Sequence, residues 1–178
     1  MASVESLAAL CAGAINHNRT PARSSSTERL SKSEIAGLLS GLSPDEMMMA
    51  QAKYMDDDDA KIDLICAVRR YTHLMARSQS WKIEGNKINA LADIATGEAL
   101  SPNRCKRCNG IGHKLNKACM PCNGTGFKAT SIRKMASVVG INESTFRASW
   151  MEKLSMILNY VYDLDGAVNR RVSMNSRD

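Results

Sequence analysis

The sequence predicts a mainly α-helical protein with a small four-cysteine module of short β ribbons next to a helix-turn-helix. Three observations support this fold class. Apolar residues recur at helical spacing, and no segment of the first hundred residues alternates as a strand would. Helix-capping signals precede the periodic segments. Four of the six cysteines form two C-x-x-C pairs within one short stretch, 105–122.

The first hundred residues divide into a flexible segment and a helical region. Residues 1–30 form the flexible N-terminal segment, because 16–30 are polar and rich in Ser and Arg. Residues 31–102 form the helical region. Ser31 and Glu34 have the spacing of a capping box, and Gly41 ends the short helix that follows. Ser43 caps a second helix that runs to about Tyr54, with Glu46 where the carboxylate of a capping box belongs.

Two further helices complete this region. Acidic residues 56–59 complement the dipole of a helix start, which favours a third helix to about Ser78 over a metal cluster. Its apolar face is expected at Ile62, Ile65, Cys66, Val68, Thr72 and Met75. The fourth helix covers EGNKINALADIATGEAL and ends at Ser101-Pro102. Cys11 and Cys66 are expected to be buried thiols, since cysteine behaves as a small hydrophobe in cores.

The charge of the chain is unevenly distributed. The net charge is +6, with −2 in residues 1–100 and +8 in residues 101–178. From Arg104 to Lys134 there are eight basic residues and no acidic one. This asymmetry favours a polyanionic partner, most often nucleic acid. No apolar run has the length of a membrane helix and no signal peptide is recognised, so the cytoplasm is the expected location.

The cysteine pattern predicts a structural zinc site in a module covering 103–128. Cys105, Cys108, Cys119 and Cys122 read C-x2-C-x10-C-x2-C, which suits one zinc ion held in a closed tetrahedron. The second pair repeats the first after 14 residues, as do the glycines that follow each pair. Those glycines let the chain turn its amides toward the sulfurs. His113 lies between the pairs and is expected on the surface.

Other chemistry for these cysteines is disfavoured. A thioredoxin-like centre needs one C-x-x-C at a helix start within a βαβ unit, and that setting is missing. Disulfides are disfavoured because no secretion signal is recognised. A catalytic zinc keeps one position open for water, whereas four cysteines leave none. No catalytic constellation is found elsewhere, so the sequence does not predict an enzyme.

Residues 129–165 are predicted to form a helix-turn-helix. Ala136 is small where two helices would cross, and Gly140 follows four residues later, where the turn takes positive φ. The expected apolar residues around them are Met135, Val139, Ile141 and Phe146. Ser149 stands where an apolar residue is usual, and Trp150 can supply that packing. Residues 166–178 are expected to form a polar tail.

This segment offers a set of candidate DNA contacts. They are Arg133, Lys134, Asn142, Ser144, Thr145, Arg147 and Lys153. Arg147 is the candidate for reading guanine in the major groove, because guanidinium matches two acceptors of that base. The basic residues at 133, 134 and 153 are expected to meet phosphates. Asn142 or Ser144 can also cap the second helix.

These motifs together resemble the late-gene antitermination proteins of lambdoid phages, the Q family. The resemblance rests on the paired cysteine knuckles, on STFRASWMEKLSMILNYV after them, and on IEGNKINALADIA before them. It implies binding to a DNA element in the late promoter and to paused host RNA polymerase, at the sigma factor and the β flap. Polymerase would then read through terminators into the late genes. The near-neutral helical region 31–102, with its apolar faces, is the expected polymerase-contacting part, although the resemblance assigns no individual contact residues, and the host cytoplasm is the expected location.

Two alternatives remain open at the level of sequence. One is a zinc-stabilised helix-turn-helix regulator without antitermination activity; for it, as for the antiterminator, a homodimer on DNA is possible, because one helix-turn-helix reads only a few base pairs. The other is a zinc-dependent adaptor that binds proteins, since Hsp40-type cochaperones share the C-x-x-C-x-G-x-G repeat. Those cochaperones normally carry four repeats and a His-Pro-Asp motif, and this chain has two repeats and no such motif.

Overall fold

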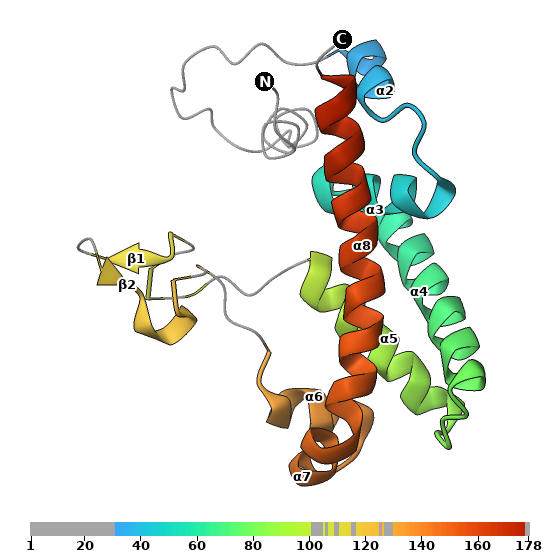
Figure 1. The fold of residues 1–178 in the computed structure, drawn as a ribbon, viewed down its shortest axis with the longest axis vertical. Helices are drawn as coiled ribbons and strands as arrows, with labels where there is room; N and C mark the ends of the chain where they lie inside the picture. The colour runs from blue at the N-terminus through green and yellow to red at the C-terminus, as the bar shows by residue number, and fades with distance from the viewer. Residues whose placement is uncertain are drawn as a thin grey trace. The chain divides into compact units, whose positions relative to one another are not determined.

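The computed structural model describes residues 31–100, 105, 107–108, 111–114, 117–124, 126 and 130–176. The chain is mainly helical and carries one two-stranded sheet, as predicted (Figure 1). It forms two compact units, one of residues 1–67 with 162–178 and one of residues 68–161. The expectations for 1–30 and for Cys11 lie outside the described residues.

The first unit begins with two capped helices, α2 (Lys32–Leu38) and α3 (Pro44–Tyr54). Both predicted capping boxes are present. The Ser31 amide donates to the Glu34 carboxylate at 2.6 Å, and the Ser43 amide donates to that of Glu46 at 2.7 Å. These reciprocal contacts satisfy amides that have no partner within the helix, which fixes where each helix starts.

The predicted polar tail is a helix. Helix α8 runs from Met151 to Asn175, and Val168 and Val172 in its last turns are completely buried. Asp165 accepts hydrogen bonds from Lys53 at 2.7 Å and from the Tyr54 hydroxyl at 2.6 Å. These contacts to α3 hold the end of α8 in the first unit, so the composition of 166–178 was a poor guide to its structure.

A second tie closes this unit. The side-chain amide of Asn175 donates to the carbonyls of Gly37, Leu38 and Ser40 at 3.0–3.2 Å. Carbonyls at the end of a helix lack partners within it, so Asn175 supplies what α2 needs there. The contact joins residues about 135 apart in sequence.

Helix α4 (Asp58–Ser78) starts and ends as predicted, but its buried face differs. Leu64, Val68 and Thr72 are fully buried, whereas Ile62 is 60% exposed and Cys66 is exposed. Alanines at 60, 67 and 76 complete the buried face. The expectations for Ile62 and Cys66 were therefore wrong: the buried side chains follow one stripe through Leu64, Val68 and Thr72, and positions 62 and 66 lie about half a turn away from it.

The second unit packs helices around α5 (Gly85–Leu100) and the start of α8. Its core includes Ile88, Leu91, Leu154, Ile157 and Val161. Arg69 of α4 holds Asp93 of α5 through two hydrogen bonds of 2.7 Å. The rings of Tyr71 and Tyr160 stack with centroids 3.7 Å apart. The remaining elements are the hairpin β1 (His113–Lys114) and β2 (Lys117–Ala118), η1 (Met120–Cys122), α6 (Ile132–Val139), α7 (Glu143–Thr145) and η2 (Phe146–Trp150).

Candidate metal centre and neighbouring helices

Four buried cysteines come together at one point. The Sγ atoms of Cys105, Cys108, Cys119 and Cys122 all lie within 4.8 Å of one another. Two of the pairs, 105 with 119 and 108 with 122, are 3.8 Å apart. A tetrahedral ion with metal–sulfur bonds of about 2.3 Å places its sulfurs about 3.8 Å apart. The cluster therefore has the size of a four-thiolate metal site and could hold one ion.

Glycine 112 turns the chain back after the first pair. Its φ is +80°, a conformation open mainly to glycine, and a Cβ there would lie 2.2 Å from the carbonyl oxygen of Gly124. Its amide faces the Cys108 sulfur at 3.3 Å. Hydrogen bonds from the main chain to a ligand sulfur orient that ligand and lower its basicity. The glycine repeat predicted from sequence thus has a steric and an electrostatic reason.

The second pair lies on a comparable turn. Cys119 precedes η1, Asn123 takes the left-handed conformation with φ +48°, and the Gly124 amide donates to the Cys119 carbonyl at 3.2 Å. Gly124 and Gly126 both have positive φ. Every described glycine of the two repeats therefore adopts a conformation that other residues disfavour.

The two repeats bind each other reciprocally. The Cys119 amide donates to the Gly112 carbonyl at 2.8 Å, and the Cys105 amide donates to the Gly126 carbonyl at 2.9 Å. Cys105 and Cys119 are equivalent positions in the 14-residue repeat, and so are Gly112 and Gly126. The two hydrogen bonds are therefore equivalent, each running from one repeat to the other. These two bonds bring the first cysteine of each pair next to the other repeat.

The thiols in this cluster differ in acidity. Backbone hydrogen bonds from Cys108 and then Arg107 lower the pKa of Cys105 to about 7. Burial raises the pKa of Cys119 to about 12, with a further contribution from hydrogen bonding to Cys122. Since ionised sulfurs 3.8 Å apart repel one another, a bound cation is needed to keep all four as thiolates.

The geometry fits a structural rather than a catalytic centre. All four candidate ligands are cysteines, and a tetrahedral ion bound by all four has no open position. His113 is exposed on β1 and is not part of the cluster, as expected. Soft thiolate ligands select zinc, copper(I) or iron–sulfur chemistry over magnesium and calcium. The four predicted ligands are thus brought together.

The helix that follows the module ends in a well-defined motif. In α6 the Ile141 amide donates to the Ala136 carbonyl at 3.0 Å and the Gly140 amide donates to the Ser137 carbonyl at 3.2 Å. Gly140 has φ +75°. This pair of bonds with a left-handed glycine is a Schellman motif, which stops the helix and redirects the chain. Met135, Ala136 and Val139 are buried, as predicted.

The next helix starts at once. Asn142 is its N-cap and accepts a hydrogen bond from the Thr145 amide at 2.7 Å. Ser144 donates to the same side-chain oxygen at 2.8 Å. Helices α7, η2 and α8 follow one another without a break, so this helix runs from Glu143 to Asn175. Of the two predicted caps, Asn142 therefore has the role.

A wide helical turn resolves the anomaly at position 149. In η2 the Met151 amide donates to the carbonyl of Phe146, five residues earlier, which is the bonding of a π turn. Phe146 is fully buried, Trp150 is 9% exposed, and Ser149 is exposed. The additional residue in this turn brings Trp150 to the core side, as the sequence had suggested it could.

The candidate DNA contacts do not all face the same way. Ser144, Thr145 and Arg147 are exposed near the start of the second helix, and Arg147 pairs with Glu143 at 3.0 Å. Arg133 is exposed on α6. Lys153 instead donates to the Ser149 carbonyl at 2.6 Å and its Nζ lies 5.8 Å from the centre of the Trp81 ring. That lysine is directed toward its own protein.

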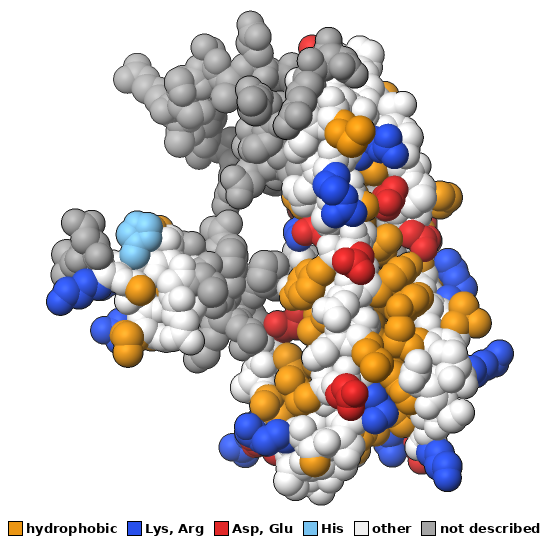
Figure 2. All heavy atoms as spheres, viewed as in Figure 1, with side chains coloured by type: hydrophobic (Ala, Val, Ile, Leu, Met, Phe, Trp, Pro, Cys, Tyr) orange, Lys and Arg blue, Asp and Glu red, His pale blue; other side chains and the backbone are white. Residues whose placement is uncertain are grey.

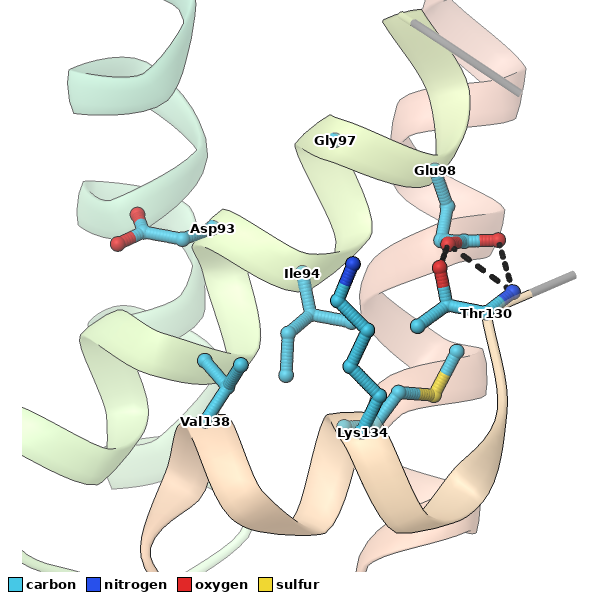
Figure 3. Close-up of a pocket in the computed structure, with 8 residues that line it drawn as sticks. Asp93, Ile94, Gly97, Glu98, Thr130, Lys134 and Val138 are labelled. Atoms are coloured by element: carbon cyan, nitrogen blue, oxygen red, sulfur yellow. Dashed lines mark hydrogen bonds between the residues drawn. The ribbon is translucent and has the colours of Figure 1, made fainter. Parts of the chain in front are cut away.

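Lys134 borders a pocket between α5 and α6. The pocket has a volume of about 310 Å³ and is lined by Asp93, Ile94, Gly97, Glu98, Thr130, Lys134, Met135 and Val138. Figure 3 shows Lys134 extending from α6 toward α5 beside Ile94. Lys134 is nevertheless exposed, so its ammonium lies at the edge of this pocket.

Glu98 is a structural residue that sequence reasoning missed. Its carboxylate accepts hydrogen bonds from the Thr130 amide at 3.3 Å and from the Thr130 hydroxyl (Figure 3). Thr130 is the second residue before α6. Glu98, which belongs to α5, therefore fixes the point where the chain enters α6. Glu98 and Thr130 are 32 residues apart, and no motif of neighbouring residues in the sequence predicts a contact over that separation.

Sequence comparisons add no family assignment. No family model and no curated protein matches this chain. Among the described helices, none has both the length and the apolar character needed to cross a membrane.

Proposed function

We propose that this protein is a zinc-dependent DNA-binding transcription factor that acts as an antiterminator. It would bind a DNA element of a phage late promoter together with host RNA polymerase, so that polymerase reads through terminators. The observation that carries the DNA-binding part is the segment from α6 to α7. There a Schellman turn at Gly140 is followed by an Asn142-capped helix with Ser144, Thr145 and Arg147 exposed near its start.

Zinc is the metal that this proposal assigns to the four-cysteine cluster. Sulfur–sulfur distances of 3.8 Å match the edge of a zinc–thiolate tetrahedron, about 3.8 Å for bonds of about 2.3 Å. A closed site of four thiolates gives zinc a folding role, because binding the ion and ordering the module are one process. The ion would hold the cysteine module in shape, and the proposed DNA-binding helices follow that module in the sequence.

The helices from Ile132 to Trp150 would act as a helix-turn-helix. Helix α6 contacts α7 and η2, the small Ala136 of α6 is buried, and Phe146 and Trp150 of the second helix are buried as well, which supports this proposal. Exposed polar residues in its first turns can then enter a major groove. Arg147 would leave its exposed partner Glu143 for a guanine, a small cost since exposed i,i+4 pairs contribute only about 0.3–0.5 kcal/mol.

The antitermination part follows from the resemblance to the Q family, and unit 1 offers a surface for a protein partner. A groove of about 500 Å³ lies between α2 and α3, with Ile35, Leu39, Leu42, Met47 and Met55 in its lining. Apolar clefts of this kind suit side chains from a partner protein. This groove belongs to the region 31–102, where polymerase contacts are expected.

Zinc-dependent recognition of duplex DNA tests the proposal. Zinc-loaded protein should bind a duplex that carries the promoter region more tightly than it binds a duplex of scrambled sequence. Chelation of zinc should abolish the preference and readdition should restore it. The affinity should fall steeply with salt, because phosphate contacts release counterions. Equal affinity for both duplexes with and without zinc would contradict the proposal and leave a zinc-dependent adaptor as the better description.

A further inference from the structure

The hairpin of the cysteine module places two lysines against each other. Strands β1 and β2 pair antiparallel with His113 opposite Ala118 and Lys114 opposite Lys117. Both lysines are exposed, and neither forms a salt bridge with any residue in the part of the chain that the structure describes. Like charges directly opposite each other destabilise a hairpin. A two-residue ladder has little packing to offset such repulsion.

Nothing acidic in the local sequence compensates these lysines. The stretch from Arg104 to Lys134 has eight basic residues and no acidic one. A zinc ion with four thiolates carries a net charge of −2, which leaves the stretch strongly positive. The hairpin therefore has an unbalanced positive charge that an external anion would relieve.

Two large apolar side chains of the module are also exposed, one just before β1 and one just after β2. Ile111 is 64% exposed and Met120 is 81% exposed. Figure 2 shows basic and hydrophobic side chains next to each other on the surface of this module. Large apolar side chains exposed on so small a module mark a contact surface.

We propose that this hairpin is a second duplex-DNA contact, separate from the helices after Gly140. The inference rests on the proposed function, because it assumes a zinc-bound DNA-binding protein. Lys114 and Lys117 would contact phosphates on the two sides of a minor groove. Ile111 and Met120 would press against sugars and base edges, as aliphatic wedges of minor-groove proteins do.

Duplex DNA fits this surface better than the other candidate partners. Single-stranded nucleic acids are held mainly by stacking on aromatic side chains, and none of the described residues of the hairpin is Phe, Tyr or Trp. A protein partner would need an acidic surface matched to one small hairpin. The many phosphates of a duplex supply regularly spaced charge on both sides of a groove.

The salt dependence of binding provides the test. The double variant Lys114→Gln/Lys117→Gln keeps all four zinc ligands, so its zinc content should equal that of the wild type. Each lost phosphate contact reduces the slope of log affinity against log salt by about 0.9, so the slope should fall by about 1.8. Fluorescence anisotropy with a duplex of the promoter region measures this slope. The control Arg77→Gln/Lys82→Gln removes two exposed charges elsewhere in unit 2 and should leave the slope near that of the wild type.

The apolar residues have a different signature. Ile111→Ser/Met120→Ser should weaken binding several-fold with an unchanged salt slope, because no charge is removed. A slope for the lysine variant equal to that of the wild type would overturn the inference. If the lysine variant kept the DNA affinity and salt slope of the wild type but lost terminator readthrough, the hairpin would instead be a protein-binding surface.

Failure of this inference is distinguishable from failure of the proposed function. If wild-type protein does not bind duplex DNA at all, the proposed function itself is wrong. If the wild type binds, Arg147→Ala binds more weakly and both hairpin variants bind like the wild type, then only the hairpin inference is overturned.

Discussion

The main-chain amide of Cys119 donates a hydrogen bond of 2.8 Å to the carbonyl of Gly112. This one contact links the turn of the first cysteine pair to the first ligand of the second pair. Its counterpart joins Cys105 to Gly126 at 2.9 Å, so the site depends on both repeats at once. Damage to either repeat should therefore disable the whole metal centre.

Cys108→Ser should abolish zinc binding and unfold residues 105–124. Zinc contributes about 10–16 kcal/mol to the folding of small zinc peptides, far more than a hairpin this short could recover. Zinc content by mass spectrometry and amide hydrogen exchange of the module provide the measurements. Cys66→Ser is the matched control, because Cys66 is exposed on α4 and should leave zinc content unchanged. A Cys108→Ser protein with one tightly held zinc would contradict the ligand assignment.

Gly112→Ala should weaken zinc binding at least tenfold. The new Cβ would lie 2.2 Å from the Gly124 carbonyl oxygen, at a φ of +80° that alanine disfavours. Competition with a chromophoric chelator measures the affinity. The control is Gly97→Ala in α5, where a Cβ meets nothing within 4 Å. That control should keep zinc affinity and raise stability by about 0.5–1 kcal/mol, because glycine is costly within a helix. Equal zinc affinity of the two variants would disprove the steric argument.

Zinc affinity should rise with pH. The pKa of Cys119 is raised to about 12, so this thiol is protonated at neutral pH and must release a proton when zinc binds. The pKa of Cys105 is lowered to about 7, so this thiol still carries a proton only below about pH 7. Below that pH, zinc binding releases a proton from Cys105 in addition to the one from Cys119. The sign follows: zinc affinity falls as the pH is lowered below about 12, because Cys119 is then protonated, and it falls more steeply below about pH 7, where Cys105 also holds a proton. Titration calorimetry in buffers of different ionisation enthalpy counts the released protons. Binding with no proton release at pH 8 would contradict this assignment.

Ser80→Gly should stabilise unit 2 by about 1 kcal/mol. Ser80 has φ +52°, and the left-handed region costs a non-glycine residue roughly 1–2 kcal/mol. The amides of Ser80 and Trp81 bond to Arg77 and Ala76, so Ser80 occupies the glycine position of a Schellman motif. Urea unfolding measures the change. Ser155→Gly within α8 should act in the opposite direction, since glycine is less favourable than serine within a helix by about 0.5 kcal/mol. A loss of stability with both variants would exclude the conformational explanation.

Arg147→Ala should cost about 1–3 kcal/mol of binding free energy for the preferred sequence and relax base preference at one position. Glu143→Gln removes its exposed partner and should leave DNA preference intact, because the pair contributes only about 0.3–0.5 kcal/mol. Anisotropy measurements on a set of single-base variants of the duplex separate these effects. A uniform loss over all sequences would place Arg147 on a phosphate.

Local patterns in the sequence were enough for the cysteine site and for most helix starts. Ligand spacing, glycines and capping residues act over a few residues, so Cys105, Cys108, Ser31 and Ser43 could be interpreted without a fold. The bonding of Asn142 and Gly140 was likewise local. For these features, residue type and spacing determine the geometry directly.

Contacts between distant segments were not predictable. Asn175 bonds to carbonyls about 135 residues away, and Asp165 joins Lys53 over 112 residues. Such partners turn a polar-looking tail into a packed helix. The buried face of α4 also depends on which neighbours cover it, which is why Ile62 and Cys66 were placed in the core wrongly. Nor does helical spacing foresee a π turn such as η2.

Single-round transcription with host RNA polymerase tests the central claim most directly. The template would carry a phage late promoter region of the kind that the proposed function assigns as the target, followed by a strong terminator. Zinc-loaded protein should raise readthrough on this template and not on one with an unrelated promoter, and Cys108→Ser should have no effect. Binding to the promoter with unchanged readthrough would contradict antitermination and leave a promoter-binding regulator. Unchanged readthrough without promoter binding would contradict the whole account.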